Sequence, residues 1–463
     1  MATTTWLRKL GLTVLVFGAC WGGALWYWRA TNRMPSSVDL TSWLLVLPLG
    51  LLLAGWLAAK FLGPRAPPAG VAQESPAPAA AEPVPPPAGA PLAILGAALR
   101  APHGSSPEDL AGALADNKAR ADLDPELLDD AGFPVMTARS GDADDAGVQE
   151  AVKAWFALNG YPHLDLHAEQ WRALVMGSAV ALELAASASA DLLPPDGKAP
   201  TLQLLPMLPS EWSAEERTAA GQWLRHVIVD AGWPAAQVAL AAELPDAGAT
   251  DPMSALARLS QHHAANPGSL VAIMLACGSH LGHESIGQWE GRGALFTSMR
   301  PQGLIPGEGA AGLLLTDLAT ARAVEGAAIA MLHTVDEARR HSSADDAKKS
   351  DAATLGVLAE KVLVRGAAQA SEVAMIVADT GHRTSRVLEL MGLAGAATPQ
   401  LDTDTDVVRL GSGSGTCGAV PFMTALALGH HHAILLGAPV LCISNEDPYR
   451  RCAAVIRPAA SLC

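Results

Sequence analysis

Two long apolar runs open this 463-residue chain. Residues 10–28 contain no charged side chain, and residues 43–62 contain a single charged side chain, that of Lys60. An apolar helix of about 20 residues is long enough to cross the hydrocarbon core of a bilayer. Aromatic residues gather at the end of the first run, and Trp43 opens the second, as in the aromatic belts of membrane proteins. We therefore predict two transmembrane helices within residues 1–63.

The basic residues beside these runs indicate an orientation. Four of them lie on the two outer flanks and two lie in the connecting loop, which favours both ends in the cytoplasm. We therefore expect a multi-pass inner-membrane protein whose soluble part is cytoplasmic. The alternative is a lipoprotein signal that ends at Cys20, but Phe17 suits such a signal poorly and the apolar run continues past the cysteine.

Residues 64–91 consist mostly of proline, alanine and glycine, with ten prolines. Such a composition cannot bury a core and tends to extend as polyproline. We interpret this segment as a linker that separates the membrane helices from the rest of the chain.

From residue 92 onward, short apolar runs alternate with amphipathic stretches of helical period. Strands are expected at residues 92–99, 202–208, 238–244, 270–276, 312–316, 327–333, 373–379, 439–444 and 453–457. Helices are expected at residues 215–230, 252–263, 352–367, 384–392 and 418–428. The alternation predicts an α/β domain over residues 92–463, with parallel strands covered by helices on both faces. It divides into halves at about 92–320 and 321–463.

Charge and cysteine content exclude several classes of protein. The chain carries a net charge of −15, and the part after residue 65 holds 25 basic and 45 acidic residues, a net charge of −20. This charge argues against binding to nucleic acid or to an anionic lipid surface. The six cysteines include no CxxC pair, so neither a disulfide framework nor a zinc knuckle is indicated.

Three motifs resemble those of β-ketoacyl synthases and thiolase-like enzymes. Residues 300–312, which include Gly307, Glu308 and Gly309, resemble the GEGA turn and strand of those enzymes. Residues 378–384 resemble their His-Gly-Thr segment, and residues 414–419, with Gly418 and Ala419, resemble their Gly-His-x-x-Gly-Ala segment. The resemblance implies a thiolase-like fold of two α/β halves, and a homodimer.

The catalytic residues that the resemblance implies do not match the residues of this chain. The resemblance implies a cysteine nucleophile at the start of the helix at 252–263, but residues 247–251 contain none. Asp379 and Gly415 stand where the family has two histidines. We therefore expect the fold to be retained and the catalytic residues to be lost.

Two alternative functions would still use the substrate pocket that the resemblance implies. One is an acyl-condensing or acyl-transfer enzyme near the membrane, in which Cys277 or Cys417 takes over as nucleophile. Cys417 is the better candidate, since a helix N-terminus there would lower the pKa of its thiol. The other is a protein that binds an acyl chain without reacting with it.

A second resemblance covers the whole layout after the linker. Residues 123–127 and 132–135, with residues 378–386 downstream, resemble an uncharacterised proteobacterial family. Its best-described member is an adaptor for a phospholipase effector of the type VI secretion system. The resemblance implies a membrane-anchored, non-catalytic adaptor that binds a lipase-type toxin and hands it to the secretion spike.

The remaining polar clusters favour plain structural roles, so we expect no metal site and no cofactor. His280 and His283 lack a third ligand, and residues 430–432 are placed to cap the end of an apolar helix. Residues 445–447 are typical of a solvated hairpin turn. The charges between residues 322 and 340 are typical of an exposed helix face.

Overall fold

The computed structural model describes residues 89–194, 198–240, 251–346 and 352–459, together with Phe17, Trp21, Gly22, Tyr27, Trp43 and Leu47. Cys20, nearly all of the two expected membrane spans and most of the linker at 64–91 lie outside the described residues, so the spans stay a prediction. Among the described helices, α6 (Ala168–Leu192) alone is long and apolar enough to cross a membrane. Because 61% of its apolar window is buried and it packs on the sheet, we interpret α6 as a core helix.

Ten strands form one mixed sheet in two halves of five. The first half is β1 (Leu92–Arg100), β4 (Leu202–Met207), β5 (Val238–Leu240), β6 (Val271–Ser279) and β7 (Glu308–Thr316). The second half is β8 (Ala330–Arg339), β9 (Met375–Ala378), β10 (Val407–Arg409), β11 (Val440–Ser444) and β12 (Arg450–Pro458). The order β10-β9-β11-β12-β8-β1-β7-β6-β4-β5 repeats one arrangement in both halves, and β1 and β8 join them.

The expectation of purely parallel strands is wrong. In each half the fifth strand, β7 or β12, runs antiparallel to both of its neighbours. The other pairs within each half are parallel, and β1 and β8 pair antiparallel where the halves join. The connection at residues 445–449 shows the reason in the second half: it is too short for the crossover that a parallel partner needs. Strand β8 also takes in residues 336–339, which the sequence analysis had assigned to an exposed helix.

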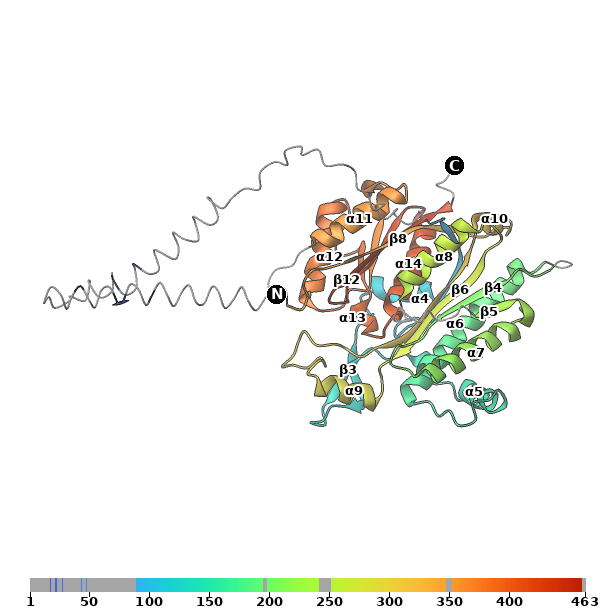
Figure 1. Ribbon diagram of the computed structural model, residues 1–463, viewed down its shortest axis with the longest axis horizontal. Helices are drawn as coiled ribbons and strands as arrows, with labels where there is room; N and C mark the ends of the chain where they lie inside the picture. The colour runs from blue at the N-terminus through green and yellow to red at the C-terminus, as the bar shows by residue number, and fades with distance from the viewer. Residues whose placement is uncertain are drawn as a thin grey trace, which may run out of the picture. The chain divides into compact units, whose positions relative to one another are not determined.

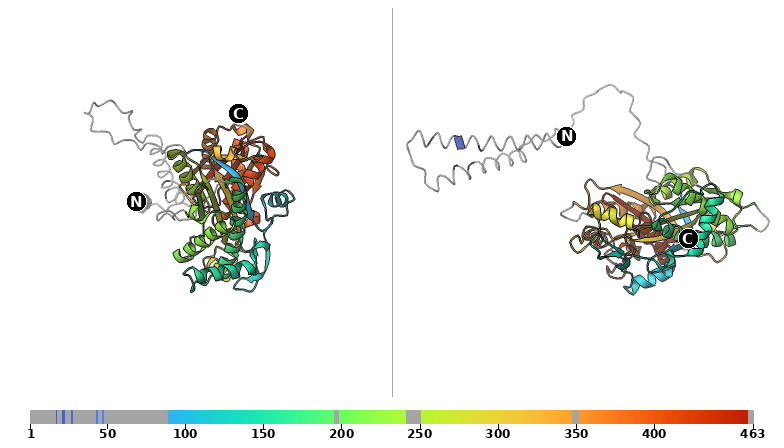
Figure 2. Two further views of the ribbon diagram at one scale, coloured as in Figure 1. Left: turned by 90° about the vertical axis from the view of Figure 1, so that its right-hand side faces the viewer. Right: turned by 90° about the horizontal axis from the view of Figure 1, so that it is seen from below.

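Helices cover both halves and fill the space between them (Figure 1). On the outer face of the first half lie α6 and α7 (Ala214–Asp230), and on that of the second lie α11 (Ala353–Arg365) and α12 (Thr384–Ala397). Between the halves lie α8 (Pro252–Ala265) and α14 (Val420–Leu436), and α14 contacts strands of both. Figure 2 shows these layers from two further directions.

The burial of α14 and β6 follows from their sequences. Residues 420–429 are buried without exception, as expected of a helix that is apolar on every face and lies between two sheets. All nine residues of β6 are buried, since helices cover both faces of the strand. The central layer therefore holds the two halves together through apolar contacts.

Shorter elements complete the domain. They are α4 (Pro107–Ala115), α5 (Ala146–Leu158), α9 (His283–Gly291), α10 (Leu318–Arg322), α13 (Gly411–Ser414) and the hairpin of β2 (Asp122–Leu128) and β3 (Pro134–Thr137). The hairpin and α9 share a small core of their own, formed by Leu127, Val135, Leu281, Ile286 and Leu295.

Candidate functional site

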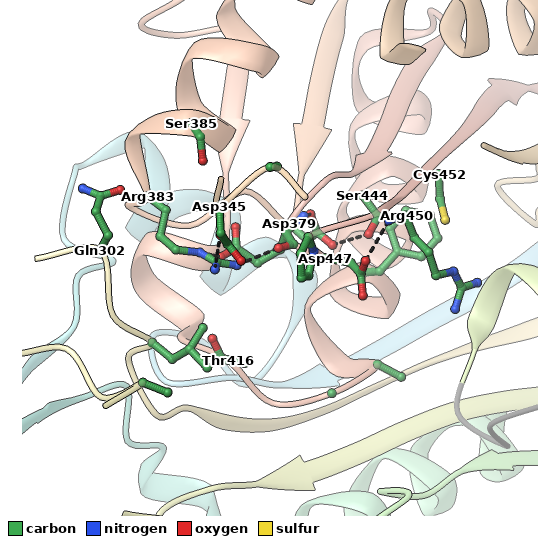
Figure 3. A pocket seen from close by; sticks show the side chains of 18 of the residues that line it. Gln302, Asp345, Asp379, Arg383, Ser385, Thr416, Ser444, Asp447, Arg450 and Cys452 are labelled. Atoms are coloured by element: carbon green, nitrogen blue, oxygen red, sulfur yellow. Dashed lines mark hydrogen bonds and ion pairs between the residues drawn. The ribbon is translucent and has the colours of Figure 1, made fainter. Parts of the chain in front are cut away.

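A cavity of about 1420 Å³ lies at the ends of β9, β11 and β12, beside the first turns of α8 and α14 (Figure 3). Asp251, Asp379 and Thr416, the neighbour of Gly415, all line it. The structure thus brings together the three places at which the synthase resemblance put a nucleophile and two histidines. Its charged lining consists of Asp251, Glu337, Asp345, Asp379, Glu446, Asp447, Arg300, Arg339, Arg383 and Arg450.

Asp251 caps α8 at the place expected for a nucleophile. Its carboxylate accepts hydrogen bonds from the backbone N–H groups of Met253 (3.3 Å) and Ser254 (3.2 Å). It also forms an ion pair with Arg450, the first residue of β12, which in turn binds Glu337 at 2.8 Å. Burial alone would raise the pKa of Asp251, but the hydrogen bonds from Ser254 and Arg450 bring it below its usual value.

Asp379 follows β9 and holds the β11–β12 hairpin in place. Its buried carboxylate accepts hydrogen bonds from the Ser444 hydroxyl and from the backbone N–H groups of Asn445 (2.9 Å) and Glu446 (3.3 Å). Burial raises the pKa of Asp379 to about 6 despite these donors. The hairpin is therefore not the solvated turn expected from its sequence, because Asn445 is fully buried and Glu446 lines the cavity.

Gly415 lies where two loops cross without room for a side chain. Its φ is +61°, and a Cβ atom there would lie 2.8 Å from the carbonyl oxygen of Pro306. A Cβ atom on Gly307, in the opposite loop, would lie 2.0 Å from the carbonyl oxygen of Ser414. The backbone of Thr416 bonds to the opposite loop at 2.7 and 3.2 Å, which fixes the crossing. A histidine therefore cannot occupy position 415 in this backbone.

Glu308 of the GEGA-like motif begins β7 and is fully paired. It accepts two hydrogen bonds from Arg172 of α6 (2.7 and 2.6 Å), one from the backbone of Ser140 (2.8 Å) and one from the Ser279 hydroxyl (3.0 Å). Arg172, which the sequence analysis missed, is buried too. The arrangement ties α6 to β6 and β7 and leaves Glu308 no free oxygen for a ligand.

A second charged group borders the cavity in the second half. Arg383 binds Glu446 at 2.8 Å and Asp345 at 3.1 Å, and Arg386 binds Asp345 at 2.8 Å. Figure 3 shows Asp345 and Arg383 directed toward one another. The sequence contains no local sign of this group, because Asp345 is far from Glu446 along the chain.

The four described cysteines are buried, and burial raises the pKa of each thiol. Cys417 lies three residues before α14 and is buried. Burial raises the pKa of its thiol, so the expectation that a helix N-terminus lowers this pKa is wrong. Burial raises the pKa of Cys277, on β6, to about 12. The pKa values of Cys442 and Cys452 are raised for the same reason, although Cys452 lines the cavity.

The histidines form no metal centre in the part of the chain that the structure describes. The ring of His280 packs on Trp289 at 4.9 Å, and His283 is the first residue of α9. Residues 430–432 do not cap a helix end, since α14 continues to Leu436. Burial lowers the pKa of His430 to about 4, so this ring is a neutral core group near neutral pH.

Comparison with solved structures shows a ketosynthase-like, thiolase-like fold. A ketosynthase domain of oxazolomycin biosynthesis from Streptomyces albus superposes with a TM-score of 0.53 at 14% identity, over 80% of this chain and 74% of that one. The ketosynthase of module 6 of the Bacillus subtilis bacillaene synthase gives 0.53 at 12% identity, over 80% and 72%. A type II polyketide ketosynthase solved with its acyl-carrier protein gives 0.53 at 14%, over 80% and 100%.

No family model matches the chain, and no curated protein matches it in sequence. At these identities the solved structures establish the fold alone. The expected thiolase-like architecture of two α/β halves is therefore confirmed, while the resemblance to the type VI adaptor family stays a prediction.

Proposed function

We propose that this protein binds a partner through a ketosynthase-like scaffold and catalyses no condensation. The observation that carries the proposal is the ion pair between Asp251 and Arg450 at the N-terminus of α8. A condensing enzyme needs a thiolate at this helix end. An acid occupies the end here, and its own cation already neutralises it.

The charge of the cavity also opposes condensation. Negative charge develops on both the nucleophile and the thioester oxygen in acyl condensation, and donors or cations must stabilise it. The charged lining holds six carboxylates and four guanidinium groups, and Asp379 replaces one of the two expected bases. With a pKa of about 6, Asp379 is mostly ionised at neutral pH and would repel that charge.

The partner we propose is a secreted effector. The resemblance of residues 123–127, 132–135 and 378–386 to the type VI adaptor family supports a lipase-type toxin as cargo. The predicted membrane spans and linker would tether the domain and raise its local concentration around the cargo. The acidic domain would steer a basic surface toward it.

The alternative is an acyl-condensing or acyl-transfer enzyme. One observation favours it: the fold is that of ketosynthases, and the cavity lies where the family resemblance places the active site. This alternative needs a reactive thiol, and Cys452 is the described cysteine that lines the cavity.

A labelling experiment separates the two. The full-length chain in detergent is treated with chloroacetyl-pantetheine, a thiol-reactive acyl mimic, and analysed by peptide mass spectrometry. We expect no adduct at the four buried cysteines, Cys277, Cys417, Cys442 and Cys452, in the folded protein and labelling of all four after denaturation. Stoichiometric labelling of Cys417 or Cys452 that an acyl-pantetheine thioester blocks would establish the enzyme instead.

The choice of cargo has its own test. The full-length chain should co-purify with an effector encoded beside its gene, and deletion of the chain should stop export of that effector while the secretion machine still fires. Absence of a complex together with normal export would refute the adaptor role and leave the labelling result unaffected.

A further inference from the structure

The β2–β3 hairpin has an inward face that is firmly packed. Its inward side chains are Asp124, Leu127, Val135 and Thr137, all nearly fully buried. Leu127 and Val135 enter the small core shared with α9. The Asp124 carboxylate accepts hydrogen bonds from the Thr137 hydroxyl (2.7 Å) and from Arg139 (2.9 Å). The hairpin is therefore a fixed part of the domain.

Its outward face is apolar and exposed. Leu123 pairs with Met136, and Leu128 pairs with Pro134, across the two strands. Directly paired residues of an antiparallel ladder point to the same side, so all four share the outward face. Leu123 is 58% exposed, Leu128 is 46% exposed, and Phe133 beside them is 67% exposed. A solvent-facing side of a hairpin normally carries polar residues.

Carboxylates outnumber basic groups around this apolar centre. Asp122, Glu126 and Asp130 are exposed on the same hairpin, and Asp129 is half-buried. One of them, Glu126, forms an ion pair with Arg139 at 3.3 Å. No lysine or arginine occurs between residues 121 and 138. The combination of an apolar centre and a mainly acidic rim is typical of a recognition surface rather than of a soluble loop.

The surface is separate from the cavity. None of the hairpin residues lines the cavity described above. The hairpin lies beside α9, outside the ten-stranded sheet (Figure 1). A ligand of one site therefore need not touch the other.

We propose that the outward face of the β2–β3 hairpin is a docking surface for a protein segment that carries apolar side chains flanked by lysine or arginine. The rim favours this occupant by charge, since basic groups would face the exposed carboxylates of Asp122, Glu126 and Asp130. Anionic lipid headgroups would be repelled by the rim, and so would a second copy of the same acidic hairpin. The inference rests on the proposed function, because it names where and by what chemistry the chain binds a partner.

The test measures, by fluorescence anisotropy, the binding of a fluorescent peptide of alternating leucine and lysine to the full-length chain in detergent. The variant L123S/L128S/F133S should bind the peptide about tenfold more weakly than the wild type. The matched control L158S/V364S/L435S removes exposed apolar side chains from α5, α11 and α14 and should bind as the wild type does. An all-lysine peptide should bind weakly to every variant.

Hydrogen exchange locates the contact. The peptide should protect amides of residues 122–136, and physiological salt should weaken binding compared with low salt. Equal binding by the two triple variants, or protection elsewhere, would overturn the proposal. Protection of the hairpin amides in the absence of peptide would also overturn the proposal. Protection seen only in nanodiscs would assign the face to lipid, and protection that increases with protein concentration would assign it to a second copy of the chain. Failure here leaves the cysteine-labelling result untouched, so the two proposals fail separately.

Discussion

The guanidinium group of Arg450 donates a hydrogen bond to the carboxylate of Asp251, although the two residues are 199 positions apart in the chain. The contact joins the start of β12 to the start of α8 and so links the two halves at the mouth of the cavity. A helix N-terminus attracts anions, and here the ion pair of Asp251 and Arg450 already occupies it.

Replacing Arg450 by methionine should remove this link and leave the Asp251 carboxylate without its cation. We expect the free energy of unfolding to fall by about 1–2 kcal/mol. A larger loss is not expected, because the Arg450 side chain is 38% exposed and solvent screens the charge that remains. Asparagine caps helices as well as aspartate does, so D251N/R450M should regain most of the loss in urea unfolding. A double variant no more stable than R450M would contradict the pairing.

The raised pKa of Asp379 predicts a dependence of stability on pH. Its carboxyl is easier to protonate in the folded chain, where the pKa is about 6, than in the unfolded chain, where it is 3.8. Its contribution is therefore fully present below pH 3.8 and is lost as the pH rises through about 6. Relative to D379N, the wild type should lose about 2 kcal/mol between about pH 4 and pH 7. Urea unfolding measures this, with exposed Asp404→Asn as the control, and parallel curves for wild type and D379N would rule the effect out.

Two glycines with the same backbone conformation offer a matched pair of substitutions. Gly415 and Gly418 both have φ of +61°, but a Cβ atom on Gly418 meets nothing within 4 Å. Gly418→Ala should cost about 1 kcal/mol, from backbone strain alone. Gly415→Ala must also push the opposite loop away and should cost several kcal/mol more, or prevent folding. Similar melting temperatures for the two variants would show that the loops are not in close contact.

The buried pair of Glu308 and Arg172 should be far more important for stability than an exposed pair. Arg172→Met leaves a buried carboxylate without its cation and should cost about 3–5 kcal/mol. Lys118→Met, which removes an exposed ion pair with Asp116, should leave the free energy of unfolding almost unchanged. Chemical unfolding compares the two variants, and equal losses would mean that the Glu308 network contributes little.

Burial explains why so many elements could be predicted from the sequence. Strands such as β6 and β11 are short apolar runs because both faces of the sheet are covered, and such runs stand out in the chain. Helix α6 was missed because its buried residues occupy more than one face, so it lacks a one-sided period. Strand direction was wrong because the alternation of runs carries no information about it.

The site was harder to predict than the fold. Family motifs placed Asp379 and Gly415, and the structure brings both beside the cavity. The partners that define their environments come from distant segments: Ser444 for Asp379 and Pro306 for Gly415. No local pattern announces such pairs, since Ser444 lies on the strand beside β9 and Pro306 lies in the other half of the domain.

The crossing of the loops at Gly307 and Gly415 constrains how this sequence can change. Each glycine is required by the backbone of the other loop, so neither position can accept a side chain until the opposite loop has moved. We expect a single substitution at either position to destabilise the fold. A histidine at position 415 would therefore need a compensating change in the loop that contains Gly307, so the two halves would have to change together at this point.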